Sequence, residues 1–143
     1  MNIKIKKLRE SARIPMYGSD FAAGCDLYSC VSADIMPHET VKIGTGLAME
    51  LPEGYFGAIF ARSGLATKEG LRPANCVGVV DSDYRGEFIV ALHNDSNEPR
   101  HINIGDRIAQ LAILPYITAT FDEVEELSDT TRGAGGFGHT GKN

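Results

Sequence analysis

Residues 75–86, NCVGVVDSDYRG, place two carboxylates directly after an apolar run. The run, residues 76–80, is typical of a buried strand or of one arm of a hairpin, because valine favours extended backbone. Asp81 and Asp83 follow it, and a carboxylate beside buried apolar surface is costly unless a partner binds it. An aspartate is ionised at neutral pH and accepts a proton from water. The stretch is therefore a candidate site, although an acidic hairpin tip without a role explains the pattern equally well.

Residues 128–143, SDTTRGAGGFGHTGKN, differ in composition from the rest of the chain. They contain five glycines and one large apolar residue, Phe137, so they bury too little surface to fold alone. A disordered end without a role is the usual outcome, but Arg132 and Phe137 among glycines favour a flexible arm that closes over a ligand. Residues 136–142 match part of a phosphate-binding P-loop. Asn143 replaces its required serine or threonine, which excludes that motif.

The elements that must position these residues are short and extended. Residues 52–54, Pro-Glu-Gly, form one of many predicted turns, because proline fixes one dihedral angle and glycine frees another. No apolar 3.6-residue period lasts for three turns, so only residues 63–69 are expected to form a helix. Strands at a spacing of about 8–12 residues predict a single all-β domain, a sandwich or barrel, over residues 1–127. The expected strands are residues 2–6, 41–43, 46–51, 55–61, 87–93, 101–104, 107–114 and 118–124.

The composition indicates a soluble cytoplasmic protein. A net charge of −5 and a pI near 5.3 argue against general affinity for nucleic acid or membranes. No apolar segment approaches the ~20 residues of a membrane span, and the polar start MNIKIKKLRE is no signal peptide. Three cysteines, Cys25, Cys30 and Cys76, lack the spacing of metal ligands, so we expect free thiols in a reducing compartment.

Five short motifs stand in order along the chain: residues 23–27 (AGCDL), 61–65 (ARSGL), 78–86, 105–110 (GDRIAQ) and 132–141. In this order and at this spacing they resemble the trimeric dUTPase family over nearly the whole chain. The resemblance implies a β-jelly-roll homotrimer, which agrees with the all-β prediction. It also implies Mg²⁺-assisted hydrolysis of dUTP to dUMP and pyrophosphate by water that attacks the α-phosphorus. That activity would limit uracil incorporation into DNA and supply dUMP for dTMP synthesis.

The resemblance makes Asp81 the general base. General-base catalysis of this kind contributes about 10²–10⁴-fold to a rate. The remainder would come from holding the polyanion in line and neutralising its developing charge. Asp83, two residues further on, would face the opposite side of a strand, so it is the weaker candidate.

The same resemblance implies that this stretch selects the nucleoside. Tyr84 would lay its ring against the deoxyribose and exclude a 2′-hydroxyl, whereas a core tyrosine is the alternative. Asn75 would contact uracil, and cytosine would leave buried groups unpaired at a cost of roughly 1–3 kcal/mol each. Gly78 would allow the close backbone approach that excludes the methyl group of thymine, or would serve only the backbone conformation.

Because the chain is acidic overall, a triphosphate needs a local group of hydrogen-bond donors. The resemblance implies that Arg62, Ser63 and Gly64 supply it through a guanidinium, a hydroxyl and a backbone amide at the start of the short helix. Gln110 would contact the α-phosphate.

The resemblance also assigns the metal and the tail. Asp26 matches the aspartate that holds Mg²⁺ through water, while the triphosphate supplies inner-sphere oxygens, as Mg²⁺ prefers. Arg132 would reach the γ-phosphate, and Phe137 would stack on uracil. His139 would add a phosphate contact or nothing.

The remaining polar residues have structural interpretations. Asp106 and Arg107 are expected to form an ion pair or a turn rather than to bind substrate. No partners are evident for His38, His93 and His101, so they are expected on the surface or satisfied in the core.

In the family each site draws on three chains, so the resemblance implies active sites shared in a homotrimer. Two alternatives remain. A dCTP deaminase has a related fold but needs a different basic motif after the Arg-Ser pair, where this chain has RSGLATKEG. A non-catalytic nucleotide-binding protein would need neither Asp81 nor the complete tail.

Overall fold

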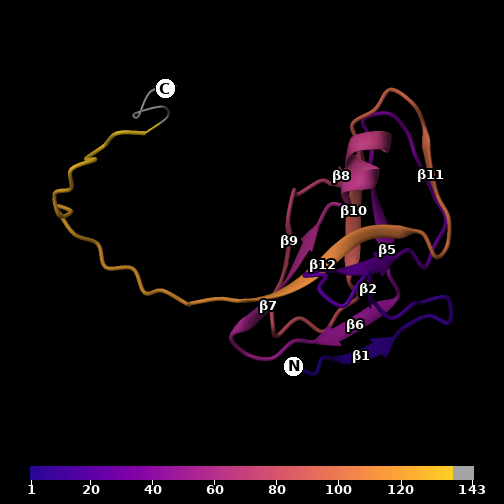
Figure 1. Cartoon of the computed structure of the whole chain (residues 1–143), viewed down its shortest axis with the longest axis horizontal. Coiled ribbons are helices and arrows are strands. Elements are labelled where there is room, and N and C mark those ends of the chain that lie inside the picture. Colours follow the sequence, from indigo (N-terminus) through magenta and orange to yellow (C-terminus); the bar gives the residue numbers. More distant parts are fainter. Residues whose placement is uncertain (137–143) are drawn as a thin grey trace.

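This computed structural model describes residues 1–136, which contain twelve short strands and one short helix (Figure 1). The strands are β1 (Lys4–Lys7), β2 (Met16–Tyr17), β3 (Cys25–Tyr28), β4 (Ala33–Ile35), β5 (Thr40–Gly44), β6 (Leu47–Glu50), β7 (Tyr55–Phe60), β8 (Leu71–Pro73), β9 (Gly78–Val80), β10 (Ile89–Asn94), β11 (Arg100–Ile102) and β12 (Arg107–Pro115). The helix is η1 (Leu65–Glu69), a single π-helical turn. Within these residues, no helix reaches the length and apolarity that crossing a membrane requires.

The strands form four antiparallel sheets. The largest has the order β2-β3-β12-β7-β9, and a second has the order β5-β10-β8. Two further sheets are the pairs β1-β6 and β11-β4. Except for β2 and β3, neighbouring strands are distant in sequence, so the chain crosses repeatedly between sheets, as in a jelly roll. The predicted all-β, jelly-roll-like fold is confirmed.

A continuous apolar core lies between the sheets, and alternation along the strands builds it. In β10, Val90 and Leu92 are buried, whereas Ala91 between them and His93 after them are more exposed. Asn94 ends the strand fully buried, and its side-chain amide donates to the carbonyls of Ile35 and Glu98, so this polar group is satisfied.

Strand β12 lies at the centre of the largest sheet and brings three distant motifs side by side. Its Gln110 is opposite Asp26 of β3 on one side and opposite Phe60 of β7 on the other. The ladder is irregular between Arg107 and Ala109, which is typical of a β-bulge.

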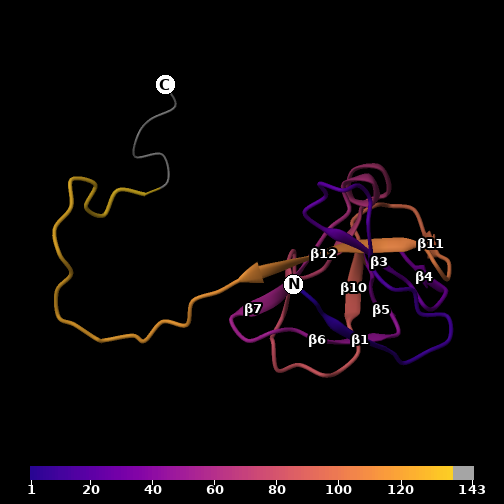
Figure 2. The same ribbon diagram turned by 60° about the horizontal axis from the view of Figure 1, so that its bottom comes forward.

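The predicted strand over residues 118–124 is wrong. After Pro115 the chain leaves the body as an extended arm, with no strand in residues 116–136 (Figures 1 and 2). Ile117 is 95% exposed and Phe121 is 93% exposed. Extended, partly apolar residues form a strand only where another strand pairs with them, and residues 1–136 supply no partner there.

The expectation of a buried strand over residues 76–80 is also wrong. Only β9 is extended, and it is an edge strand that pairs with β7 alone. Its Val79 is 65% exposed. Cys76 has a φ of +61°, outside the extended region, so the strand starts later than expected. No two-stranded hairpin forms either, because β10 joins a different sheet.

Four strands were not predicted: β2, β3, β4 and β8. Strand β3 has the sequence CDLY and is buried along three of its four positions. A strand buried on both faces lacks the alternation of polar and apolar residues that signals a half-exposed strand. The short helix lies where residues 63–69 predicted it.

The three cysteines are free, as expected; Cys25 and Cys30 are buried and Cys76 is exposed. His38 and His101 are exposed and His93 is partly buried, and each has a polar partner that was not evident from the sequence. The partners are Asn97 for His38 at 3.2 Å, Thr40 for His93 at 2.9 Å and Asp34 for His101 at 2.6 Å.

Candidate active site

A cluster of one carboxylate and two guanidinium groups lies where β3, β7 and β12 meet. Asp26 Oδ1 is 3.1 Å from Arg62 Nε, and Asp26 Oδ2 is 3.3 Å from Arg107 Nη1. Arg62 Nη1 also donates to the carbonyl oxygen of Arg107 at 3.1 Å. The Asp26 side chain is only 9% exposed, so the carboxylate forms the floor of the cluster. We call Asp26, Arg62, Arg107 and Gln110 the cradle.

The cradle follows from the sheet register rather than from sequence proximity. Gln110 stands opposite Asp26, and Arg62 lies two residues beyond Phe60, the β7 residue opposite Gln110. A Cβ on Gly24 would lie 3.5 Å from the Cβ of Gln110, so the chain before β3 also packs closely here. Three of the motifs identified in the sequence therefore meet at one point.

The charged groups of the cradle leave it with a net positive charge. Two guanidinium groups face one carboxylate, so the cluster carries excess positive charge in a chain whose net charge is −5. Asp26 Oδ1 and Arg62 Nε face each other, but neither has a hydrogen-bond partner, and among residues 1–136 they are the only buried side-chain atoms of this kind. The two atoms nevertheless form an ion pair at 3.1 Å, so the Asp26 carboxylate compensates the buried charge of Arg62.

The turn after Arg62 adds backbone donors. Gly64 has helical dihedral angles of −62° and −43°, and a Cβ added to it would meet nothing within 4 Å. Ser63 is exposed, and its carbonyl accepts from the Thr67 hydroxyl at 2.7 Å. The first amides of a helical turn have no partners within it, so they are available to an anion beside Arg62.

The second group of predicted residues surrounds the turn after β9. Asp81 and Tyr84 line one cavity of about 220 Å³, together with residues 79, 80 and 87–89. Asp81 faces this cavity where the strand ends, and the Tyr84 ring, 44% exposed, forms part of its wall. The structure therefore brings the predicted base and the predicted sugar contact together.

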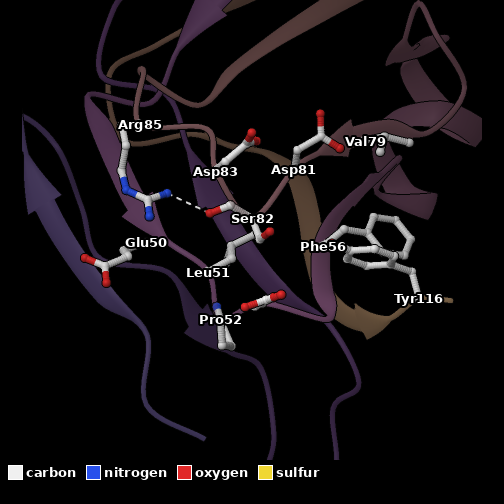
Figure 3. A pocket seen from close by; sticks show the side chains of 11 residues that line it. Glu50, Leu51, Pro52, Phe56, Val79, Asp81, Ser82, Asp83, Arg85 and Tyr116 are labelled. Carbon is white, nitrogen blue, oxygen red and sulfur yellow. Dashed lines mark hydrogen bonds between the residues drawn. The ribbon is translucent and has the colours of Figure 1, made fainter. Parts of the chain in front are cut away.

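Asp81 also lines a larger cavity of about 930 Å³ (Figure 3). Figure 3 shows Asp81, Ser82 and Asp83 along one turn of chain, with the edge-to-face pair of Phe56 and Tyr116 beyond them. The lining contains four carboxylates and one guanidinium, that of Arg85, which donates to the carbonyl of Ser82 at 2.7 Å. This negative cavity repels a triphosphate, so phosphates near Asp81 need cations from elsewhere.

The sequence argument against Asp83 rested on a strand that is absent here. Residues 81–83 form a turn, so alternation between two faces does not apply. The two aspartates differ instead in their surroundings. Asp81 lines both cavities, whereas Asp83 lines only the larger one and does not border the cavity of Tyr84.

Asn75 and Gly78 lie next to each other at the start of β9. A Cβ on Gly78 would be 3.1 Å from the Cβ of Ile59 and 3.6 Å from the side-chain nitrogen of Asn75. Packing against β7 therefore already favours glycine at this position. Asn75 is exposed, and its carbonyl accepts from the amide of Val77 at 2.6 Å, so its side chain is open to a ligand.

The cradle and the turn at Asp81 lie at opposite ends of β7. Val80 pairs with Gly57, so Asp81 follows near the start of that strand, whereas Arg62 lies past its end. At about 3.3 Å per residue, the segment from Gly57 to Arg62 spans roughly 16 Å. Within one chain, Asp81 and Arg62 are therefore separated along the length of β7.

The tail is only partly described. Arg132 Nε donates to the carbonyl of Gly135 at 2.7 Å, within the arm itself. It touches neither group of site residues. The predicted roles of Phe137 and His139 lie outside the described residues.

The side chains present fit a magnesium ion only through bridging water, without direct ligation by the protein. Within residues 1–136, no group of three or more histidine, cysteine, aspartate or glutamate side chains is arranged to hold a metal. Asp26 is occupied by two arginines, so it suits contact through water better than direct ligation. The residues present therefore fit Mg²⁺ that arrives with a triphosphate.

Sequence reasoning missed Arg107, for which it expected only an ion pair with Asp106 or a turn. Asp106 does form a turn, because its carboxylate accepts from the backbone amide of Asn103 at 2.7 Å. Arg107 instead joins the cradle through Asp26. Its place opposite β3 could have indicated this, but only once the β3–β12 register was known.

Comparison with known proteins gives one consistent family. The family model described as dUTPase matches residues 10–141. The chain is 54% identical to the deoxyuridine 5'-triphosphate nucleotidohydrolase of Nautilia profundicola, over 99% of this chain and 100% of that protein. It is 48% identical to the protein of the same name from Desulfitobacterium hafniense, over 99% of this chain and 97% of that protein.

Solved structures agree with this result. The dUTPase of Staphylococcus bacteriophage 80alpha with dUpNHpp has a TM-score of 0.91 at 30% identity, over 98% of each chain. A variant of the dUTPase from phage phi11 of S. aureus has a TM-score of 0.84 at 27% identity, over 90% of this chain and 100% of that one. That structure is described as revealing the coordination of a structural Mg(II) ion.

Proposed function

The chain belongs to the dUTPase family, and from this premise we propose that it is a dUTP diphosphatase that hydrolyses dUTP to dUMP and pyrophosphate. One structural observation supports the proposal above the others: Asp81 and Tyr84 line the same cavity. A proton acceptor, Asp81, thus lies beside the flat ring of Tyr84, which can pack against a deoxyribose and exclude a 2′-hydroxyl.

Asp81 acts as the general base in the proposed reaction. Its carboxylate accepts a proton from a water molecule, and the water oxygen attacks the α-phosphorus. The bond from this phosphorus to the oxygen that bridges it to the β-phosphorus breaks, which releases pyrophosphate. Asp83 is the weaker candidate for this role, because it does not line the cavity that Asp81 and Tyr84 share.

The cradle holds the triphosphate. Arg62 offers a forked donor beside the exposed Ser63 hydroxyl and the open amide of Gly64, and Gln110 adds a neutral donor for the α-phosphate. Arg107 supplies a second guanidinium. These groups neutralise the charge that develops on the transferred phosphoryl oxygens, which is the main catalytic contribution available to a protein in such reactions.

The proposed metal is Mg²⁺, which supplies charge neutralisation to the phosphate oxygens when it is bound. Asp26 would hold it through water. The same carboxylate orients Arg62 and Arg107, so its substitution should disturb phosphate binding as well as metal binding.

We place the complete site between chains of a homotrimer. The distance along β7 between Asp81 and Arg62 supports this arrangement, as does the negative charge of the larger cavity. Asn75, Gly78, Asp81 and Tyr84 of one chain would meet the cradle of a second. Residues 128–143 of a third chain would form the closing arm, with Arg132 on the γ-phosphate and Phe137 on uracil.

In this role the enzyme would limit uracil incorporation into DNA and supply dUMP for dTMP synthesis. The free thiols support a reducing compartment, the cytoplasm. No nucleic acid or membrane partner is required for the reaction.

A pyrophosphate-release assay with dUTP, dCTP, dTTP and UTP, each with Mg²⁺, tests the proposal. We expect rapid release from dUTP and slow release from the other three nucleotides. Ammonia release from dCTP would favour the deaminase alternative. Binding of dUTP without turnover would favour a non-catalytic nucleotide-binding protein.

A further inference from the structure

The Tyr84 ring is folded back over its own turn. Its hydroxyl donates to the carbonyl oxygen of Glu87 at 3.1 Å, and its ring lies 6.3 Å from that of Phe88 at an interplanar angle of 41°. The ring is therefore held at its tip and along one side. Nothing in these two contacts explains why it lies as close to the turn as it does.

Gly86 accounts for that closeness. A Cβ placed on Gly86 would overlap the hydroxyl oxygen of Tyr84 and would lie 2.5 Å from its Cζ atom and 3.0 Å from its Cε2 atom. Real Cβ atoms do not approach other heavy atoms so closely. The ring thus occupies the space that any side chain at position 86 would take.

The backbone gives no other reason for glycine here. Gly46, Gly54, Gly70 and Gly105 have positive φ angles, which favour glycine, but Gly86 is not among the residues of positive φ. An alanine at position 86 is therefore compatible with the backbone. Its methyl group would conflict with the Tyr84 side chain, and no atom of another residue would lie closer than 3.0 Å.

The turn cannot easily move away to relieve that conflict. Glu87 Oε1 accepts from the backbone amide of Gly46 at 2.7 Å, and the Phe88 amide donates to the carbonyl of Leu47 at 2.8 Å. Phe88 itself is buried, with 1% of its surface exposed. The ring of Tyr84, 44% exposed, is the part that is free to shift.

From this geometry we infer that Gly86 is a specificity-determining position, which sets where the Tyr84 ring stands against the sugar. The inference rests on the proposed function and extends it to a residue that does not itself contact the nucleotide. A methyl group behind the ring displaces it, so the fit to a deoxyribose is lost. The ring already disfavours a ribose, so its displacement should lower kcat/KM for UTP less than for dUTP.

Steady-state kinetics of Gly86→Ala with dUTP and UTP test the inference. We expect the ratio of kcat/KM values for dUTP over UTP to fall by about tenfold, as for other modest changes of pocket fit. The fall should come mainly from a higher KM for dUTP, because Asp81 and the cradle are unchanged. Gly18→Ala is the matched control, since a Cβ on Gly18 would meet nothing within 4 Å. It should retain the wild-type ratio.

A double-mutant cycle separates displacement of the ring from a general loss of structure. Tyr84→Ala alone should narrow the ratio, and adding Gly86→Ala to it should change the ratio no further, because no ring remains to displace. Independent losses in the two variants would overturn the inference, as would a wild-type ratio in Gly86→Ala.

A measurement without substrate distinguishes failure of this inference from failure of the proposed function. Gly86→Ala should change the NMR chemical shifts of the Tyr84 ring protons while leaving the melting temperature close to that of the wild type. Unchanged ring shifts would overturn the inference even in an active enzyme. A wild-type protein that does not hydrolyse dUTP would refute the proposed function and leave the ring displacement to be judged from these shifts.

Discussion

Asp81 and Asp83 are two residues apart, and their surroundings separate their roles. Both lie in one turn and both line the larger cavity, so neither secondary structure nor charge distinguishes them (Figure 3). Only Asp81 also borders the cavity that Tyr84 lines. A general base must lie within reach of the water that attacks the substrate, so a cavity shared with Tyr84 supports our proposal of Asp81 rather than Asp83.

Asp81→Asn should lower kcat by about 10²–10⁴-fold, the usual contribution of a general base. The amide keeps the size of the side chain but cannot accept the proton, so affinity for dUpNHpp should stay within several-fold of the wild type. Rates of pyrophosphate release and calorimetric titration check the two parts. Asp83→Asn is the matched control and should keep kcat within about tenfold of the wild type. Equal losses in the two variants would contradict the assignment.

Among the elements, β12 does most to build the site. Its register places Gln110 against Asp26 on one side and against the end of β7 on the other. A shift of one residue would turn every side chain of β12 to the opposite face, so the cradle depends on this register. The core residue Leu111, next to Gln110 and 2% exposed, helps to hold it.

The pair β4–β11 carries a pH-sensitive contact. His101 stands opposite Asp34, and its Nδ1 atom lies 2.6 Å from the Asp34 carboxylate. The hydrogen bond to Asp34 raises the pKa of His101 above its ordinary value of 6.5. A raised pKa means that the folded state favours the charged imidazole. This contact therefore contributes stability fully below the unfolded pKa and loses it as the pH rises through the folded pKa.

An NMR titration of the His101 ring should give a midpoint above 6.5, and Asp34→Asn should lower that midpoint. Because both side chains are exposed, solvent screens the pair, and the effect on overall stability should be small. His38, whose ring faces the neutral Asn97, is the internal control. An Asp34→Asn variant with an unchanged His101 midpoint would contradict the assignment.

For the molecule as a whole, the main feature is the separation of the two groups of candidate site residues within one chain. The cradle lies at one end of β7 and Asp81 at the other. An extended arm leaves the body with Ile117 and Phe121 almost fully exposed (Figure 2). Exposed apolar residues on an extended segment are typical of a surface that another chain covers. Both features support the proposed trimer with shared sites.

Mixing two inactive variants tests shared sites directly. Asp81→Asn keeps its cradle and Arg62→Ala keeps its base, so a site formed between them can contain both. After co-refolding at equal amounts, random assembly should restore roughly a quarter of the wild-type activity. Sedimentation of the wild-type protein should show a trimer.

The control for this experiment is the double variant Asp81→Asn/Arg62→Ala. Mixed with either single variant, it should restore no activity, because one necessary residue is then missing from every site. Failure of the two single variants to restore activity, or a fully active monomer, would exclude sites shared between chains.

The sequence alone determined the chemistry of the candidate site. Arg62, Asp81, Tyr84 and Gln110 were proposed as site residues through the family that the sequence motifs resemble, and the all-β fold was predicted from short apolar runs between turns. These properties are local, because side-chain chemistry and backbone preference belong to residues and their near neighbours. They needed no knowledge of which strands pair.

Only the tertiary structure decided which residues meet. It placed Arg107 beside Asp26 and Arg62 and separated this group from Asp81. It also packed the Tyr84 ring against Gly86, where a side chain would overlap it. It also left residues 118–124 unpaired, where the local pattern predicted a strand. Strand pairing, register and burial depend on partners far away in the chain, so the pattern of one segment cannot specify them.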